Sequence, residues 1–239
     1  MRILTLHPAA TEMLFAIGAG CMIVGRCDGC DYPAAALAIP SIGDANEMTP
    51  ERAAILEPDL VVLGPGQDHV IERLAAMRSV TLRFAGLEES LEEIRSLARM
   101  IGKDVEADVL VHDLRTELDR VKERVARYHR VRVYAETSHA PWGTSRLVNE
   151  IVEIAGGAPI AGTVTIEDLK RFDPQVIIVS VQGEGGEFDP DMIAARDGWR
   201  DLAAVRGERV FVIDDALLHR PGPRLAQGAK LIAKSLHGA

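Results

Sequence analysis

Side chains that bind metals or small ligands follow several of the strands that the sequence predicts. In open α/β sheets, ligands sit beyond the carboxyl ends of the strands, so groups at these positions can lie together. Imidazoles, thiolates and carboxylates are the groups that zinc, iron or cobalt would take as ligands. The candidates in the first half are His7, Cys27, Cys30, Asp68 and His69, and those in the second half are His139, Trp142, Gln182, Asp214, Asp215 and His219.

Cys27 and Cys30 form a Cys-x-x-Cys pair, for which His69 is a candidate third metal ligand. A zinc site needs about two ligands beyond such a pair, and the sequence alone does not place them. The alternative is a pair of reduced thiols beside partly exposed loop residues. The sequence therefore leaves open either a metal site at Cys27, Cys30 and His69 or no site there.

Trp142 and two arginines are candidates for contacts with a flat or anionic ligand. Trp142, beside Pro141, either stacks on a flat ligand or packs into an interface. Arg220 and Arg224 bracket a Pro-Gly-Pro turn, where they either meet an anionic group or pair with nearby acids. We favour ligand contact for Arg220.

Motifs typical of enzymes are missing from the sequence. It has no Gly-x-Ser-x-Gly elbow, no His-Glu-x-x-His pair and no Walker loop. Gly64-Pro65-Gly66 follows a predicted strand, but it lacks the third glycine of a dinucleotide-binding turn, and its proline removes an amide. A redox or transfer enzyme based on Cys27 and Cys30 is the remaining catalytic alternative. We therefore predict a protein that is not an enzyme.

Composition and charge limit the kinds of partner. The 239 residues carry a net charge of −9, which argues against nucleic acid or an anionic membrane. Hydrophobic residues make up 47% and charged residues 26%, which is ordinary globular usage, and no apolar run approaches the roughly 18 residues of a membrane span. We expect a monomer with a small-molecule ligand and no covalently bound cofactor.

The first residues and the cysteines bear on where the protein works. Arg2–Leu6 is too short for the apolar segment of a signal peptide and has the pattern of a first strand. As written, the sequence predicts a cytoplasmic protein, or a periplasmic or cell-surface protein if a leader was removed. The three cysteines make no even disulfide set, which slightly favours a reducing compartment.

A proline-free stretch between Pro65 and Pro141 contains apolar residues at steps of three and four, the spacing of one helix face. The spacing predicts a helix over Glu88–Ile101 and a longer one over Asp104–Arg127, separated at Gly102. At about 1.5 Å per residue, the second helix would span roughly 36 Å. A short coiled coil is the alternative, but we favour a helical spine that joins two lobes.

Strands alternate with helices on both sides of this spine, which predicts a mainly parallel sheet in each half. A glutamate precedes a glycine by six residues in both halves, and a glutamate precedes a proline by seven residues in both halves. The pairs are Glu12/Gly18 with Glu150/Gly156, and Glu51/Pro58 with Glu167/Pro174. We therefore predict an α/β fold of two similar Rossmann-like lobes, residues 1–87 and 130–239, joined by the helical backbone of residues 88–129.

Several motifs resemble those of class III substrate-binding proteins of ABC importers, the receptors for cobalamin and iron-siderophores. They are His7-Pro8-Ala9-Ala10-Thr11-Glu12, Cys30-Asp31-Tyr32-Pro33, Thr49-Pro50-Glu51 and His219-Arg220-Pro221-Gly222-Pro223-Arg224. The last three are similar to the cobalamin-binding branch in particular. The resemblance covers nearly the whole chain and implies two α/β lobes on one rigid helix, with the ligand in the cleft between them.

The resemblance also implies the ligand class, which is cobalamin, haem or an iron-siderophore. Small residues, Ala45 and Gly64, stand where cobalamin receptors tend to place tryptophans. The expected ligand-binding residues are His7, Cys30, Asp31, Tyr32, Trp142, Asp215, His219 and Arg220. The alternative function is a cytoplasmic binder or carrier of a free metal ion that uses Cys27, Cys30 and nearby histidines.

Glu51 and Glu167 each stand two residues after a threonine that caps a predicted helix. In the family that the chain resembles, a glutamate at the matching place on each lobe docks onto arginines of the membrane permease. The resemblance therefore implies that an ABC permease is the partner. The alternative is that each acid offsets its helix dipole, which is worth roughly 0.3–1 kcal/mol.

Overall fold

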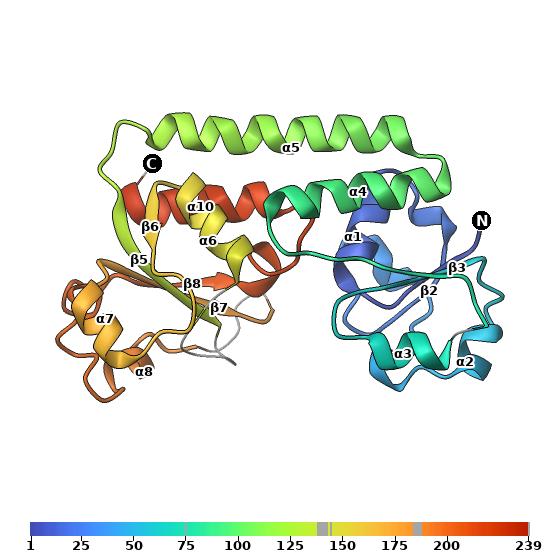
Figure 1. Ribbon diagram of the computed structural model, residues 1–239, viewed down its shortest axis with the longest axis horizontal. Coiled ribbons are helices and arrows are strands. Elements are labelled where there is room, and N and C mark those ends of the chain that lie inside the picture. Colours follow the sequence, from blue (N-terminus) through green and yellow to red (C-terminus); the bar gives the residue numbers. More distant parts are fainter. Residues whose placement is uncertain (75, 138–142, 144, 184–187, 239) are drawn as a thin grey trace. The chain divides into compact units, whose positions relative to one another are not determined.

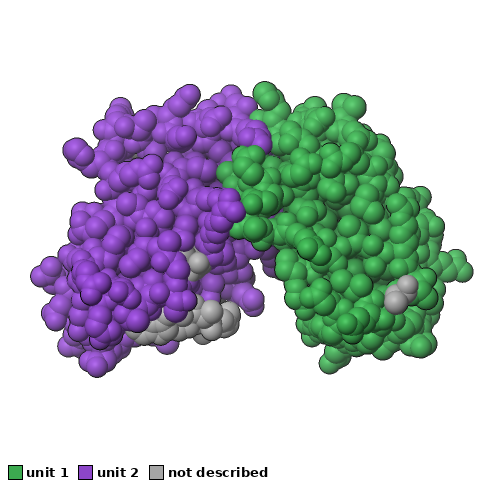
Figure 2. Space-filling model, viewed as in Figure 1, with its two compact units in different colours: residues 1–113 green, residues 114–239 purple. Residues whose placement is uncertain are grey.

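A computed structural model describes all residues except 75, 138–142, 144, 184–187 and 239. The chain divides into two compact units, residues 1–113 and 114–239 (Figure 2). The division falls within one helix, so the separate spine of residues 88–129 stays a prediction. In the described residues, no helix is long and apolar enough to cross a membrane.

The first unit is built on a parallel four-stranded sheet. Its strands are β1 (Ile3–Thr5), β2 (Ile23–Arg26), β3 (Leu60–Leu63) and β4 (Ser79–Thr81), in the order β2-β1-β3-β4. Every residue of β1 and β3 is buried, because helices cover both faces of the sheet.

The helices of the first unit lie on two sides of this sheet. Figure 1 shows α1 and α4 on one side and α2 and α3 on the other. A hydrophobic core on the second side joins Leu4 and Leu63 of the strands to Ala53 of α2 and Val70 of α3. The helices are α1 (Pro8–Ala16), α2 (Pro50–Ala54), α3 (Asp68–Arg73), α4 (Leu87–Ile101) and the first part of α5 (Asp104–Val125), with short 3-10 turns at Gly20–Met22, Ala34–Ala38 and Ala45–Glu47.

The second unit repeats this arrangement. Its strands are β5 (Val131–Thr137), β6 (Gly157–Pro159), β7 (Val176–Val181) and β8 (Val210–Asp214), all parallel and in the order β6-β5-β7-β8. The second strand of each unit thus lies at the edge beside the first strand, and the third and fourth strands follow on the other side. The prediction of two similar α/β lobes with parallel sheets is confirmed.

Helices also cover both faces of the second sheet. Figure 1 shows α6 and α10 on one side and α7 and α8 on the other. On the second side, Tyr134 and Ile177 of the strands pack with Leu169, Ile193 and Trp199. The helices are α6 (Arg146–Ile154), α7 (Ile166–Phe172), α8 (Asp191–Ala194), α9 (Ala203–Arg206) and α10 (Leu225–His237), with a 3-10 turn at Asp215–Leu217.

The two long helices α4 and α5 form where the spacing predicts them. Gly102 ends α4 in the left-handed conformation, with φ of 71°, which glycine adopts at little cost. The apolar stripe of α5 is buried, as the period of three and four requires. Its buried residues are Ala107, Val111, Leu114, Leu118, Val121 and Val125. Helix α5 ends at Val125, two residues before the predicted end.

A capping box starts α7, and it yields a first prediction. The Thr165 hydroxyl accepts a hydrogen bond from the Asp168 backbone amide at 3.2 Å, and the Asp168 carboxylate accepts one from the Thr165 amide at 3.1 Å. We expect Thr165→Ala to lower the free energy of unfolding by about 1 kcal/mol, measured by urea denaturation, because an amide at the start of the helix loses its acceptor. Thr163→Ala, in the preceding loop, is the control; an equal loss in both variants would contradict the capping role.

Candidate functional site

His7 lies at the carboxyl edge of the first sheet, directly after β1 and at the start of α1. Its ring is half-buried, and its centroid is 5.7 Å from that of Phe84, which follows β4. Gly64, directly after β3, lies against the same ring. The Gln67 side chain fixes this edge, since it accepts from the Gly64 amide at 2.7 Å and donates to the Leu6 carbonyl at 2.9 Å. Three strand ends therefore meet around the imidazole.

The contact between Gly64 and His7 yields a second prediction. A Cβ at position 64 would lie 1.9 Å from the His7 ring carbon Cδ2, far inside van der Waals contact. We expect Gly64→Ala to displace the imidazole and to cost about 1–3 kcal/mol of unfolding free energy, measured by urea denaturation. Gly222→Ala is the control, because a Cβ there meets no atom within 4 Å. Equal stability of the two variants would contradict the packing of His7 on Gly64.

Cys27 and Cys30 lie side by side at the end of β2. Their Sγ atoms are 3.3 Å apart, and Cys27 is 4% and Cys30 0% exposed. Asp31 and Tyr32, the next two residues, are exposed. Because its thiol is fully buried, Cys30 does not present a group to a ligand at the surface in this structure. The expected ligand contact of Cys30 is therefore not supported, whereas Asp31 and Tyr32 are accessible.

Of the two alternatives that the sequence left open for Cys27, Cys30 and His69, the described residues favour the pair of thiols without a metal site. Among the described residues, no group of three or more histidine, cysteine, aspartate and glutamate side chains is placed to hold a metal ion. His69 is exposed on α3 and does not complete a site with the buried Cys27 and Cys30.

The carboxyl edge of the second sheet holds a buried charge cluster. The Glu136 carboxylate at the end of β5 is fully buried, accepts from the Tyr134 hydroxyl at 2.7 Å and lies 2.7 Å from Arg196 Nη1. The Arg196 guanidinium lies 4.7 Å from the ring centroid of Trp199. Sequence reasoning missed this cluster; the only local signal was a glutamate directly following an apolar strand.

The expected ligand residues of the second unit fall in two groups. Asp215 and His219, after β8, lie together: the His219 amide donates to the Asp215 carbonyl at 2.8 Å, and the imidazole Nε2 is 4.0 Å from the carboxylate. Arg220 follows and is half-buried. His139 and Trp142 lie outside the described residues.

His219 yields a third prediction. Burial lowers the pKa of its imidazole, and the nearby Asp215 charge opposes this shift only in part. The unfolded chain therefore binds more protons, so stability is full above the ordinary histidine pKa of about 6.5 and falls as the pH drops below it. We expect His219→Gln to reduce the loss of unfolding free energy between pH 7.5 and 5.5, measured by urea denaturation at both values. The exposed His129→Gln is the control; an unchanged pH dependence in the His219 variant would contradict the buried neutral state.

Glu51 and Glu167 occupy the second position of α2 and α7, each in its own unit, and both are exposed. Hydrogen bonds from the helix backbone and from Thr49 lower the pKa of Glu51. Both carboxylates are thus accessible, as docking requires.

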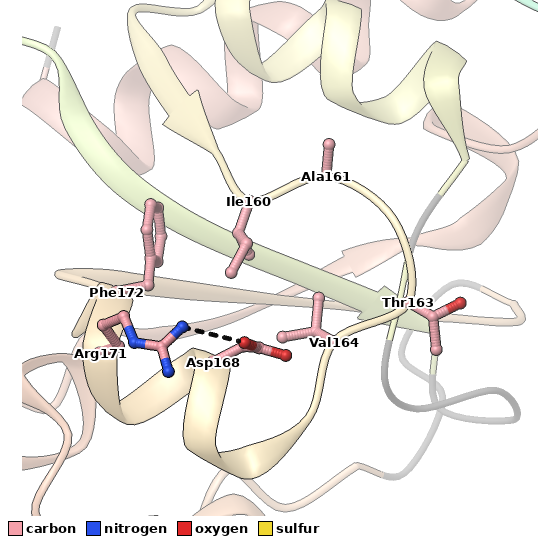
Figure 3. Close-up of a pocket in the computed structure, with 7 residues that line it drawn as sticks. All are labelled: Ile160, Ala161, Thr163, Val164, Asp168, Arg171 and Phe172. Atoms are coloured by element: carbon pink, nitrogen blue, oxygen red, sulfur yellow. Dashed lines mark ion pairs between the residues drawn. The ribbon is translucent and has the colours of Figure 1, made fainter.

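A pocket of about 540 Å³ lies in the second unit between the loop after β6 and α7 (Figure 3). Ile160, Val164 and Phe172 give it an apolar wall, and Arg171 pairs with Asp168 at 3.5 Å beside it. Among the residues that the structure describes, none of the ligand residues expected from the sequence lines this pocket.

Comparisons with known proteins extend over nearly the whole chain. A family model described as periplasmic binding protein matches residues 3–217. A Bacillus subtilis protein named as an uncharacterized ABC transporter substrate-binding lipoprotein is 26% identical over 99% of this chain and 80% of its own length. A vitamin B12-binding protein of Vibrio cholerae is 26% identical over 98% of this chain and 88% of its own length.

A solved structure has the same fold. The periplasmic heme-binding protein RhuT of Roseiflexus superposes with a TM-score of 0.83 at 22% identity, covering 99% of this chain and 98% of that one. The family match confirms the resemblance that the sequence motifs indicated. The two parallel sheets, which have equivalent strand orders, agree with the two similar lobes that the resemblance implies. This chain belongs to the periplasmic binding protein family, the substrate-binding components of ABC importers, and is a binding protein rather than an enzyme.

Proposed function

We propose that this chain binds a metal-bearing chelate, either haem, a cobalamin-like corrinoid or an iron-siderophore, at the carboxyl edges of its sheets. Two similar proteins support this ligand class, since one is named for vitamin B12 and the other for heme. No covalent attachment is needed, because the chelate is cargo that must be released to an importer.

The observation that carries this proposal is the half-buried His7 imidazole beside Gly64 and Phe84. Histidine and tyrosine are both axial ligands of haem iron, and imidazole nitrogen also suits other transition metals. His7 and the exposed Tyr32 are therefore the candidates for the metal of the chelate in the first unit. In the second unit, His219 has a lowered pKa and offers a neutral imidazole, and Arg220 would pair with an anionic group of the chelate.

Titration calorimetry with absorption spectroscopy tests the ligand class. The titrants are haem, cobalamin, a ferric siderophore and a divalent metal salt such as zinc chloride. We expect one chelate to bind with one-to-one stoichiometry and His7→Ala or Tyr32→Phe to change its spectrum, while the exposed His129→Ala leaves the spectrum unchanged. Binding of the bare metal alone would replace this proposal with the metal-carrier alternative, and binding of none would overturn it.

We further propose that the protein works as a monomer outside the cytoplasmic membrane and delivers its ligand to a permease. This location is supported by two similar proteins, one of which is named as a lipoprotein and the other as a periplasmic protein. The exposed Glu51 and Glu167 are the proposed contacts to the permease, and the net charge of −9 disfavours nucleic acid as a partner. Light scattering after size exclusion tests the monomer.

A further inference from the structure

Cys27 and Cys30 have no role in the proposed ligand binding, yet their side chains lie next to each other in the core of the first unit. Both thiols are buried in the hydrophobic core that contains Leu4, Ala45 and Met48. Neither is in a disulfide, and the Sγ atoms are 3.3 Å apart. Cys21, the third cysteine, is exposed and is not part of this pair.

The backbone holds the two cysteines in a tight turn. The Cys27 amide donates to the Thr5 carbonyl of β1 at 3.0 Å, and the Cys30 amide donates to the Cys27 carbonyl at 3.0 Å. These bonds bring both side chains to the same side of the turn. A disulfide needs an S–S distance of about 2.05 Å, so the sulfurs must approach by only about 1.3 Å.

Hydroxyl groups next to the pair distinguish the two thiols. Thr11 donates to the Thr5 hydroxyl at 2.8 Å, and the Thr5 hydroxyl is directed at Cys30 Sγ at 4.0 Å. Cys30 thus has a hydroxyl donor beside its sulfur, and such a donor stabilises the thiolate that begins thiol–disulfide exchange.

We propose that Cys27 and Cys30 form a dithiol–disulfide site that reacts with external low-molecular-weight disulfides and sets the rigidity of the loop carrying Asp31 and Tyr32. Both thiols are buried, so the reaction begins when the turn of residues 27–30 opens locally and exposes them. A protein thiolate then attacks one sulfur of the external disulfide, and the other sulfur leaves as a thiolate. The second cysteine then gives its proton to solvent and attacks the mixed disulfide, which releases the second thiolate. The protein loses two electrons and two protons in total, and the external disulfide is reduced to two thiols.

The cross-link has a direct effect on the loop. It ties Cys30 covalently to the end of β2, whereas hydrogen bonds alone hold the turn in the reduced form. Asp31 and Tyr32 follow without an intervening residue. We expect the backbone amides of residues 28–32 to exchange hydrogen more slowly in the oxidised protein, because local opening of the turn is restricted.

Equilibration with oxidised and reduced glutathione tests the site in the full-length protein carrying Cys21→Ser. After alkylation, mass spectrometry should show a single two-electron transition to a form that lacks two hydrogen atoms, carries no glutathione and is restored by dithiothreitol. Cys27→Ser and Cys30→Ser are the matched variants, and at least one should accumulate the mixed glutathione disulfide that the pair resolves. Circular dichroism checks that both variants fold.

Three outcomes would overturn the proposal. The thiols of the Cys21→Ser protein could remain reduced in excess oxidised glutathione, or only glutathione adducts could form. Equal hydrogen exchange of residues 28–32 in the two forms would also overturn it. Each of these measurements is made without a chelate, so failure of the proposed ligand class would leave the result unaffected.

Discussion

Replacing both Glu51 and Glu167 by glutamine is expected to abolish uptake of the bound chelate while its affinity for the isolated protein stays unchanged. Both carboxylates are exposed at the start of short helices, one in each unit. Glutamine keeps the shape of each side chain but removes the charge that would pair with a permease arginine. Loss of a charge partner at an interface costs about 2 kcal/mol or more, so two losses should reduce uptake by well over tenfold.

The matched control for this experiment is the double variant Glu72→Gln/Glu153→Gln. These glutamates are also exposed on helices, one in each unit, but stand outside the first turn. Uptake is measured in cells that depend on this protein for the chelate found by calorimetry. Normal uptake by the Glu51/Glu167 variant would mean that the two acids only offset helix dipoles.

Local patterns predicted most of the fold. The helical period located α4 and α5, and the Thr165 cap located the start of α7. The paired spacings of glutamate with glycine and with proline indicated two similar lobes, which the strand orders confirm. These features could be predicted because each depends on residues that are close together in the sequence.

Strand β6 was missed for a physical reason. Its residues Gly157-Ala158-Pro159 have low β propensity, and pairing with β5 makes them a strand in spite of that. The internal repeat could have predicted this strand, because β2 occupies the equivalent edge of the first sheet. A tertiary contact decided the structure where local propensity did not.

The sequence predicted the positions of candidate site residues better than their surroundings. His7, Asp31 and Tyr32 lie in the expected loops, but the full burial of Cys30 depends on core packing around the turn. The contact between His7 and Gly64 joins two strand ends that only the sheet order brings together. Such contacts between distant segments have no local pattern, so sequence reasoning could not find them.

Glu136→Ala is expected to cause the largest loss of stability of any single substitution considered, about 3–5 kcal/mol. The Glu136 side chain is fully buried, and its carboxylate lies 2.7 Å from both Arg196 Nη1 and the Tyr134 hydroxyl. Removing it leaves the partly buried Arg196 guanidinium without this counter-charge. Urea denaturation at pH 7 measures the effect.

Glu150→Ala is the matched control, because it removes an ion pair with Arg146 of the same 2.7 Å length on the surface of α6. Solvent screens such a pair, so the expected loss is below about 1 kcal/mol. The double variant Glu136→Leu/Arg196→Met should recover much of the lost stability, since no unpaired charge remains. If Glu136→Ala cost no more than Glu150→Ala, the buried pair would not anchor the carboxyl edge of the second sheet, and Arg196 would be held by Trp199 instead.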